Sequence, residues 1–273
     1  MTTLNGKAAA FLALHHGDRP LLQPNAWDVG SARLLASLGF EAIATTSSGH
    51  AATLGRLDGT VTRDEAFAHS KQLAAAVEVP VAADTENCFA DDVAGVAETV
   101  TLACATGLAG CSIEDFTRDE DTIYGIGLAA ERVAAAAEAA HRGPDQLVLT
   151  ARAENHIHGR NDLADTIARF QAYQEAGADV LFAPGLVTLN DIRSVTSSVD
   201  LPVNVLALPG CPSVDELAQV GVARVSVGGA FAFAALAGLI DAATELKNDG
   251  TYGYWERVGK AGRTIRSAFE PQA

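Results

Sequence analysis

Short apolar strand-like segments alternate with helix-like segments along the whole chain, and this regularity constrains the fold more than any other feature. Strands that alternate with helices pair in parallel, and uniformly apolar strands indicate a sheet covered on both faces. Eight such units in 273 residues favour an α/β fold of the (β/α)₈ TIM-type barrel over an open doubly wound sheet. The expected strands lie near residues 20–25, 42–47, 80–85, 110–115, 147–153, 179–184, 202–207 and 223–228.

Nothing in the sequence divides the chain. It has no linker or low-complexity break, so we expect a single barrel domain over residues 1–273, with about 251–273 as a C-terminal helical extension. Two helix starts carry capping-box spacing, at Thr62 with Glu65 and at Ser213 with Glu216. A glycine-rich GxGxxG motif does not follow the first strand, which weakens a dinucleotide-binding interpretation.

Composition argues against binding to nucleic acids or insertion into membranes. Nineteen Lys and Arg residues against 34 Asp and Glu residues give a formal charge of −15, which disfavours nucleic-acid binding. The longest uncharged stretch, Val225 to Ile240, is too short to span a bilayer, so no membrane role is expected. The four cysteines lack zinc-site spacing, and no secretory leader is visible. A cytoplasmic location with free thiols is the expectation.

Acidic residues stand at the ends of successive strands. Asp84 and Glu86 close one strand, Glu114 closes the next, and Arg152 and Glu154 close the one after. Residues two apart on a strand point to the same face, and strand C-terminal ends form the active face of a barrel. Crowded carboxylates without a balancing cation repel each other, so we expect a hard cation, Mg²⁺ or Mn²⁺, among them.

Small residues end the second strand. In the segment Thr45 to His50, backbone N–H groups around Ser47, Ser48 and Gly49 can cradle an anionic oxygen, and Asp58 follows in the same loop. Plainer alternatives remain open. The segment can be a simple turn, Asp58 an ordinary loop acid, Arg152 a structural partner of Glu154, and the strand-end acids mere partners of backbone donors or internal salt bridges.

Several motifs resemble the isocitrate lyase/phosphoenolpyruvate mutase superfamily. The similarity extends from Asn25–Asp28 to the last strand at Arg224–Gly229. Its motifs are Pro80-Val81-Ala82-Ala83-Asp84-Thr85-Glu86-Asn87, Ser112-Ile113-Glu114-Asp115, Thr150-Ala151-Arg152-Ala153-Glu154 and Leu54-Gly55-Arg56-Leu57-Asp58.

The resemblance implies a fold, a metal and a substrate class. It implies a (β/α)₈ barrel, homotetrameric or homodimeric, whose extra C-terminal helix is exchanged between subunits. It implies Mg²⁺, with Mn²⁺ possible, held by Asp84 directly and by Asp58, Glu86 and Glu114 mostly through water. The substrate is then a small carboxylate, an α-keto acid or a compound that yields one. The residues expected to bind it are Arg152, Ser47, Ser48, Gly49 and Asn204.

The loop after the fourth strand departs from the family pattern. Lyases of the family carry a catalytic cysteine in a Lys-Lys/Arg-Cys-Gly-His loop, but residues 116–125 contain no cysteine, lysine or histidine. Isocitrate lyase and methylisocitrate lyase activities are therefore not expected. The Lys- and Asn-bearing gate of the mutases is also missing. Tyr124 is the expected acid on this lid, with His50 and His156 as rivals, beside Arg152 and Glu114 as catalytic residues.

Three functions follow as hypotheses. The first is a Mg²⁺-dependent enzyme that cleaves a C–C bond in a small oxo- or hydroxy-dicarboxylate through an enolate, by decarboxylation or lyase chemistry. The second is P–C bond chemistry of the phosphoenolpyruvate phosphonomutase or phosphonopyruvate hydrolase type. The third is an α-keto-acid-binding protein without turnover.

Overall fold

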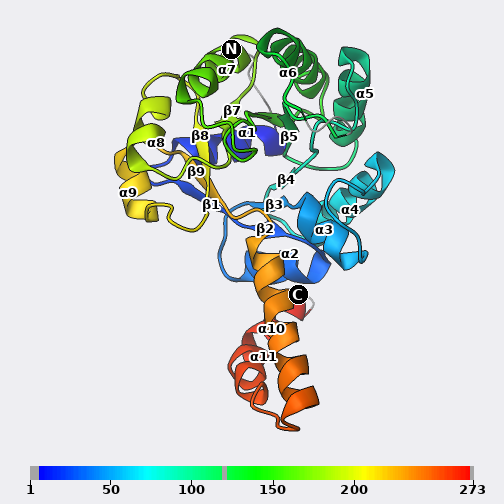
Figure 1. The fold of residues 1–273 in the computed structure, drawn as a ribbon. Coiled ribbons are helices and arrows are strands. Elements are labelled where there is room, and N and C mark those ends of the chain that lie inside the picture. The colour runs from blue at the N-terminus through cyan, green and yellow to red at the C-terminus, as the bar shows by residue number, and fades with distance from the viewer. Residues whose placement is uncertain (1–5, 119–121, 271–273) are drawn as a thin grey trace.

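The computed structural model describes residues 6–118 and 122–270, and its strands form one parallel sheet rolled into a barrel (Figure 1). The strands follow the order β1-β9-β8-β7-β6-β5-β4-β3-β2. The predicted (β/α)₈ barrel is thereby confirmed. The strand bounds are β1 Leu21–Gln23, β2 Asn25–Ala26, β3 Ile43–Thr45, β4 Val81–Ala83, β5 Gly110–Glu114, β6 Val148–Arg152, β7 Val180–Phe182, β8 Val203–Leu206 and β9 Arg224–Ser226.

The barrel closes through two short strands that act as one. β1 pairs with β9 and β2 pairs with β3, and only Pro24 separates β1 from β2. Proline has no N–H to donate to a neighbouring strand, which accounts for the break. The Pro24 carbonyl still accepts the N–H of Ala44 at 2.9 Å, so the sheet continues past the break.

Helices surround the barrel and follow the strands in turn (Figure 1). Both expected capping boxes are present, at Thr62 with Glu65 and at Ser213 with Glu216. The helix bounds are α1 Gly6–Ala13, α2 Val29–Ser37, α3 Ser47–Thr53, α4 Arg63–Ala76, α5 Val93–Cys104, α6 Ile126–Ala140, α7 Leu163–Glu175, α8 Leu189–Thr196, α9 Val214–Gln219, α10 Ala230–Asn248 and α11 Trp255–Phe269, with a short 3₁₀ turn at Leu14–His16.

The N-terminal helix α1 covers the floor of the barrel, where the strands begin. Phe11 is fully buried there in a small apolar cluster with strand-start residues that include Ala109 and Val148. Gly110 begins β5 beside it, and a Cβ at this position would lie 2.9 Å from the Phe11 ring. The absence of a side chain at Gly110 therefore lets α1 seat tightly against the sheet.

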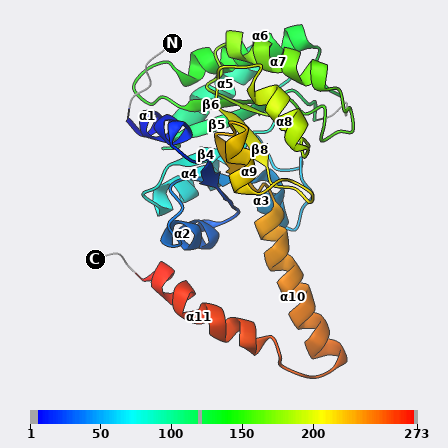
Figure 2. The ribbon, with the colours of Figure 1, turned by 90° about the vertical axis from the view of Figure 1, so that its left-hand side faces the viewer.

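Helices α10 and α11 extend away from the barrel as a hairpin-like arm (Figure 2). The end of α11 returns to the barrel body, with the Phe269 ring beside Gly30 of α2. Large apolar side chains remain exposed along the arm, among them Leu239, Ile240 and Trp255, each more than 60% accessible. Among the described helices, none is both long enough and apolar enough to cross a membrane.

Candidate active site

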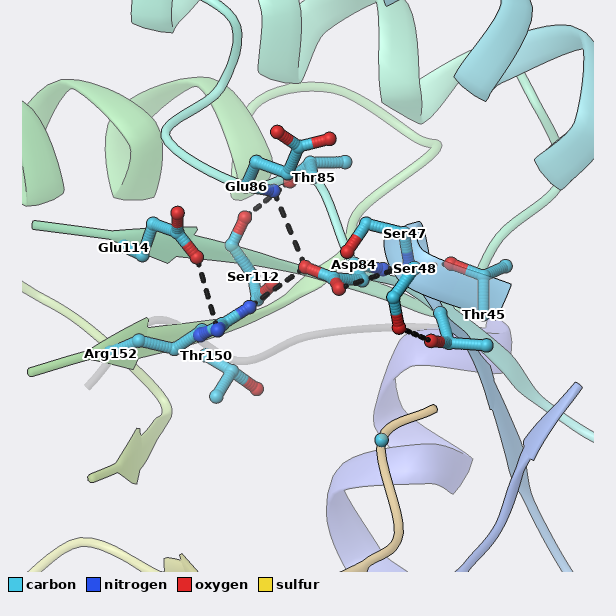
Figure 3. A network of polar contacts seen from close by, with 12 residues as sticks. Thr45, Ser47, Ser48, Asp84, Thr85, Glu86, Ser112, Glu114, Thr150 and Arg152 are labelled. Atoms are coloured by element: carbon cyan, nitrogen blue, oxygen red, sulfur yellow. Dashed lines mark hydrogen bonds and ion pairs between the residues drawn. The ribbon is translucent and has the colours of Figure 1, made fainter. Parts of the chain in front are cut away.

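Arg152 stands at the centre of a carboxylate cluster at the C-terminal end of the barrel (Figure 3). Its Nη1 lies 2.8 Å from Asp84 Oδ1, its Nη2 3.0 Å from Glu114 Oε2, and its Nε 2.9 Å from Glu154 Oε1. These residues come from the ends of three neighbouring strands, β4, β5 and β6. The structure thus brings Arg152 together with the predicted acids Asp84, Glu114 and Glu154. The expected convergence of Glu86 with Asp84 on the same point is wrong, because Glu86 follows the end of β4 in a left-handed backbone conformation.

The backbone around Asp84 fixes the direction of its carboxylate. The Asp84 N–H donates to Thr45 Oγ1 at 2.9 Å. The carboxylate in turn accepts from the N–H groups of Ser47 and Glu86, each at 3.3 Å. Asp84 therefore joins the end of β3, the start of α3 and the loop after β4.

Glu86 points away from Arg152 (Figure 3) and pairs with a second arginine. Arg118 Nε lies 3.1 Å from Glu86 Oε2. The Arg118 guanidinium also donates to the carbonyls of Gly59 and Val61 and lies 4.8 Å from the centre of the Phe89 ring. Arg118 thus ties the lid segment to the loop that carries Asp58. The role of Arg118 is not evident from the sequence, because its partners lie in two other loops.

The loop after β4 has an unusual backbone. Glu86, Cys88 and Phe89 adopt φ angles of 48°, 60° and 54°, a left-handed region that side chains disfavour. The fully buried Arg132 of α6 holds this loop by donating to the carbonyls of Asn87, Ala90 and Asp91. Surrounding structure therefore imposes the conformation that places Glu86.

The cluster contains more carboxylates than guanidiniums, and the pKa values of its buried acids are raised. Burial raises the pKa of Glu86 to about 7; Asp84 adds to the rise and Arg118 opposes it. Burial also raises the pKa of Glu114 well above its ordinary value, although Arg152 opposes that rise. Burial alone would lower the pKa of Arg152, but Glu154, Glu114 and Asp84 outweigh it and raise that pKa.

The donor set fits a hard cation in chemistry and charge. Asp58, Asp84, Glu86, Glu114 and Glu154 offer only oxygen atoms, and the two guanidiniums of Arg118 and Arg152 do not balance them. In residues 6–118 and 122–270, no three His, Cys, Asp or Glu side chains are arranged to bind one ion together. Mg²⁺ commonly keeps several waters and binds through one or two carboxylates, so the two observations agree.

The predicted cradle forms the first turn of helix α3. Thr46 caps this helix by accepting the Gly49 N–H at 3.3 Å, and the Ser47 N–H already serves Asp84. A Cβ on Gly229 would lie only 2.5 Å from Ser48 Oγ, so α3 packs closely against the loop after β9. Asp58 accepts the Gly59 N–H at 3.1 Å and is exposed overall. Partial desolvation of its carboxyl group and then the charge of Asp84 raise its pKa.

A cavity of about 160 Å³ runs into the barrel lumen from the carboxylate cluster. The predicted Asn204 lines it, with its amide nitrogen 2.9 Å from Ser226 Oγ. Asp84, Arg152 and Glu154 form its mouth, and the small residues Ala44, Ala82, Ala83, Cys111 and Ser112 line its wall.

Tyr124 lies outside this lumen. Its hydroxyl donates to Asp91, its ring stacks on the Arg132 guanidinium at 4.1 Å, and burial raises its pKa to about 12. His50 lines a smaller cavity with Asp84 and Glu86 and stacks on His69, with 3.7 Å between ring centres. The acidic lid residues 119–121 lie outside the described residues. The roles predicted for Tyr124 and His50 stay predictions, as does that of His156.

Comparisons of the chain with known proteins find a matching family model and similar relatives. The family model described as phosphoenolpyruvate phosphomutase matches residues 11–247. An uncharacterized Mycobacterium tuberculosis protein is 34% identical over 221 residues, which cover 80% of this chain and 81% of the relative.

Two solved structures are similar throughout. A Burkholderia cenocepacia protein for which a lyase or mutase activity has been suggested is 49% identical, with a TM-score of 0.92 over 97% of this chain and 96% of that one. A 2,3-dimethylmalate lyase is 26% identical, with a TM-score of 0.81 over 92% of this chain and 90% of that one.

Proposed function

The chain belongs to the phosphoenolpyruvate mutase/isocitrate lyase superfamily, and from that premise we propose that it is a Mg²⁺-dependent enzyme acting on a small α-keto acid or oxo/hydroxy-dicarboxylate through an enolate. C–C bond cleavage, of the decarboxylase or lyase type, is the reaction we favour. One observation carries the proposal: Arg152 and the strand-end acids face a lumen cavity that suits a small carboxylate.

Arg152 would bind and orient the substrate. Its planar guanidinium can hold a carboxylate or an enolate oxygen through two parallel hydrogen bonds. Breaking a bond next to a keto group leaves negative charge on that oxygen, and fixed positive charge stabilises the transition state. Asp84, with Asp58, Glu86 and Glu114, would hold the Mg²⁺, which would supply further positive charge to the substrate oxygens.

The surplus of carboxylates explains why an additional cation is needed. Three acids surround Arg152 within 3.0 Å, so its single charge is already more than balanced. An anionic substrate would be repelled from such a mouth unless a divalent ion reversed the local field.

Decarboxylation suits this lumen because it needs an electron sink more than a positioned acid. Within the described part of the chain, the cavity is lined by no histidine, tyrosine or lysine that would protonate a leaving group. Cys111 lines it, but burial holds the pKa of that thiol well above its ordinary value. The similarity to a 2,3-dimethylmalate lyase also supports C–C cleavage.

P–C bond chemistry is the second candidate, and the match to the phosphoenolpyruvate phosphomutase family model favours it. Binding of an α-keto acid without turnover is the third. We also propose that the protein is a homodimer or homotetramer, because the exposed apolar side chains of α10 and α11 would be covered by a second copy.

Proton and phosphorus NMR would test the reaction directly. The protein is incubated with Mg²⁺ and oxaloacetate, with a 2-alkylmalate, or with phosphonopyruvate. Enzyme-dependent pyruvate or another C–C cleavage product supports the first proposal. Release of inorganic phosphate or formation of phosphoenolpyruvate supports P–C chemistry. Ligand line broadening that requires Mg²⁺, without product, would indicate a binding protein.

Asp84→Ala is the decisive variant. We expect it to abolish Mg²⁺-dependent ligand broadening and at least about 10³-fold of any turnover, because one oxygen-bound cation contributes several kcal/mol to charge stabilisation. The exposed acid Asp215, changed to Ala, is the matched control and should leave both unchanged. Unaltered Mg²⁺ dependence in Asp84→Ala would remove the metal site from this end of the barrel.

A further inference from the structure

Arg224 is a buried cation deep in the barrel lumen. It stands at the start of β9, is 4% exposed, and lines the same cavity as Arg152. Its Nη1 lies 3.1 Å from His15 Nε2, and its Nη2 donates to Thr150 Oγ1 at 3.2 Å. Its Nε has no hydrogen-bond partner. The two contacting groups are both side chains at the floor of the barrel.

These partners of Arg224 are neutral. His15 Nδ1 lies 3.0 Å from the carbonyl of Phe11, which it satisfies as a donor, so His15 Nε2 accepts from Arg224. Burial and then Arg224 lower the pKa of His15 to about 3, so this ring carries no charge of its own. Within the described residues, no carboxylate lies within ion-pair distance of Arg224. Burial, with no acid opposing it, lowers the pKa of Arg224 to about 9.

Burial of a guanidinium without an anion costs free energy of folding. Other buried polar groups near Arg224 also lack hydrogen-bond partners. Asn204 Oδ1 and Ser112 Oγ are also buried without hydrogen-bond partners, and both side chains line the cavity with Arg224. The amide of Asn204 can turn to offer either its oxygen or its nitrogen. Three polar side chains with unpaired atoms thus line the same cavity.

The depth of this space relative to Arg152 follows from the strand. Thr150 precedes Arg152 by two residues on β6, so both side chains point into the lumen, about 6.6 Å apart along the strand. Arg224 contacts Thr150 and therefore lies one layer deeper than the carboxylate cluster. The cavity that both arginines line has small residues such as Ala44, Ala82 and Ser112 on its wall, beside larger ones such as Phe182 and Leu206.

We propose that Arg224 binds the distal carboxylate of a short dicarboxylate whose other end is held at Arg152, with Ser112 and Asn204 as further partners. The inference rests on the proposed function, because it assigns the substrate class of the same site. It makes the enzyme selective for dicarboxylates over monocarboxylates of equal length. The ion pair inside the lumen would supply the negative charge that the two neutral partners of Arg224 lack.

Isothermal titration calorimetry with Mg²⁺ tests this selectivity with two stable probes. Malate and 2-hydroxybutyrate differ only in that a terminal carboxylate replaces a methyl group. We expect the wild-type protein to bind malate at least about tenfold more tightly than 2-hydroxybutyrate. A charge-assisted hydrogen bond contributes more free energy than a tenfold change in Kd requires. Arg224→Met should abolish this preference by weakening malate alone. Unchanged affinity of the Arg224→Met variant for 2-hydroxybutyrate would show that this variant folds.

Two further variants separate the possible outcomes. Arg19→Met removes a surface arginine and should keep the preference. Arg152→Met should weaken the binding of both probes. This variant therefore tests the site of the proposed function and not the deep subsite at Arg224. Retention of the malate preference in Arg224→Met would overturn the inference and leave Arg224 as a structural tie to His15. Absence of binding of either probe to the wild-type protein would overturn both the inference and the dicarboxylate assignment.

Discussion

The mouth of the barrel lumen holds a partly buried arginine and its floor a buried one, and the two arginines have opposite surroundings. At the mouth, Arg152 contacts three carboxylates within 3.0 Å. At the floor, Arg224 contacts a neutral histidine and a hydroxyl. The mouth therefore has surplus negative charge, and the floor has surplus positive charge.

The opposite charges determine which ligand each end can accept. The mouth attracts a cation and tolerates an anion only once that cation is bound. The floor attracts an anion without any further ion. A dicarboxylate and a divalent cation together would neutralise both ends, whereas either one alone would leave one end unbalanced. Binding of the two ligands should therefore be mutually reinforcing.

Arg152→Met gives the largest expected effect and tests the mouth. It leaves the partly buried Asp84 and Glu114 and the buried Glu154 beside one another with no cation, so we expect the free energy of unfolding to fall by about 3–5 kcal/mol. Urea denaturation at pH 8 in the presence of EDTA measures this change. A loss below about 1 kcal/mol would mean that the cluster does not depend on Arg152.

Glu86→Gln tests the negative surplus through pH. Burial raises the pKa of Glu86 from 4.5 to about 7, so between these values the folded protein binds more protons than the unfolded chain. Stability therefore falls as the pH rises through this window and stays low above it. The full pKa shift corresponds to about 3 kcal/mol of lost stability at high pH. Glu86→Gln removes this loss, but it also removes the ion pair with Arg118, so the net increase in stability is smaller.

We expect Glu86→Gln to be about 2 kcal/mol more stable than the wild-type protein at pH 8 and nearly equal at pH 5. The measurement is urea denaturation in EDTA at both pH values. Equal stabilities at pH 8 would show that Arg118 fully compensates Glu86, and the mouth would then be less negative than described.

Arg224→Met gives the smallest change in stability and tests the floor. Methionine fills a similar volume without a charge, so removal of a cation with neutral partners should leave stability unchanged or raise it by about 1 kcal/mol. Thermal unfolding without ligand measures this effect. A marked fall in the midpoint would mean that the contact of Arg224 with His15 holds α1 to the barrel, and the contrast between mouth and floor would disappear.

The sequence predicted the mouth well because its signal is local. Strand ends follow from the alternation of apolar and helical segments, and acids at those ends must meet in a closed barrel. Asp84, Glu114, Arg152 and Glu154 were identified in this way, and the structure brings them together. Their prediction needed no knowledge of how the barrel interior is packed.

The floor was missed because its signal is distributed. Arg224 begins a strand after a glycine turn, where an arginine is ordinarily a surface residue, and its partners His15 and Thr150 are 209 and 74 residues away. The orientation of Tyr124 was equally hidden, since its partners Asp91 and Arg132 come from two other elements. Only the closed barrel shows which side chains share its interior.

The clamp of Arg132 on the loop after β4 has a consequence for the order of folding. Its three carbonyl acceptors lie 41 to 45 residues earlier in the chain, and the left-handed residues Glu86, Cys88 and Phe89 have little reason to adopt that conformation until α6 docks. We therefore expect the contacts of this loop to form late, after the folding transition state. We therefore expect the mouth to assemble late, so that weakening the Arg132 clamp accelerates unfolding and leaves the rate of folding nearly unchanged.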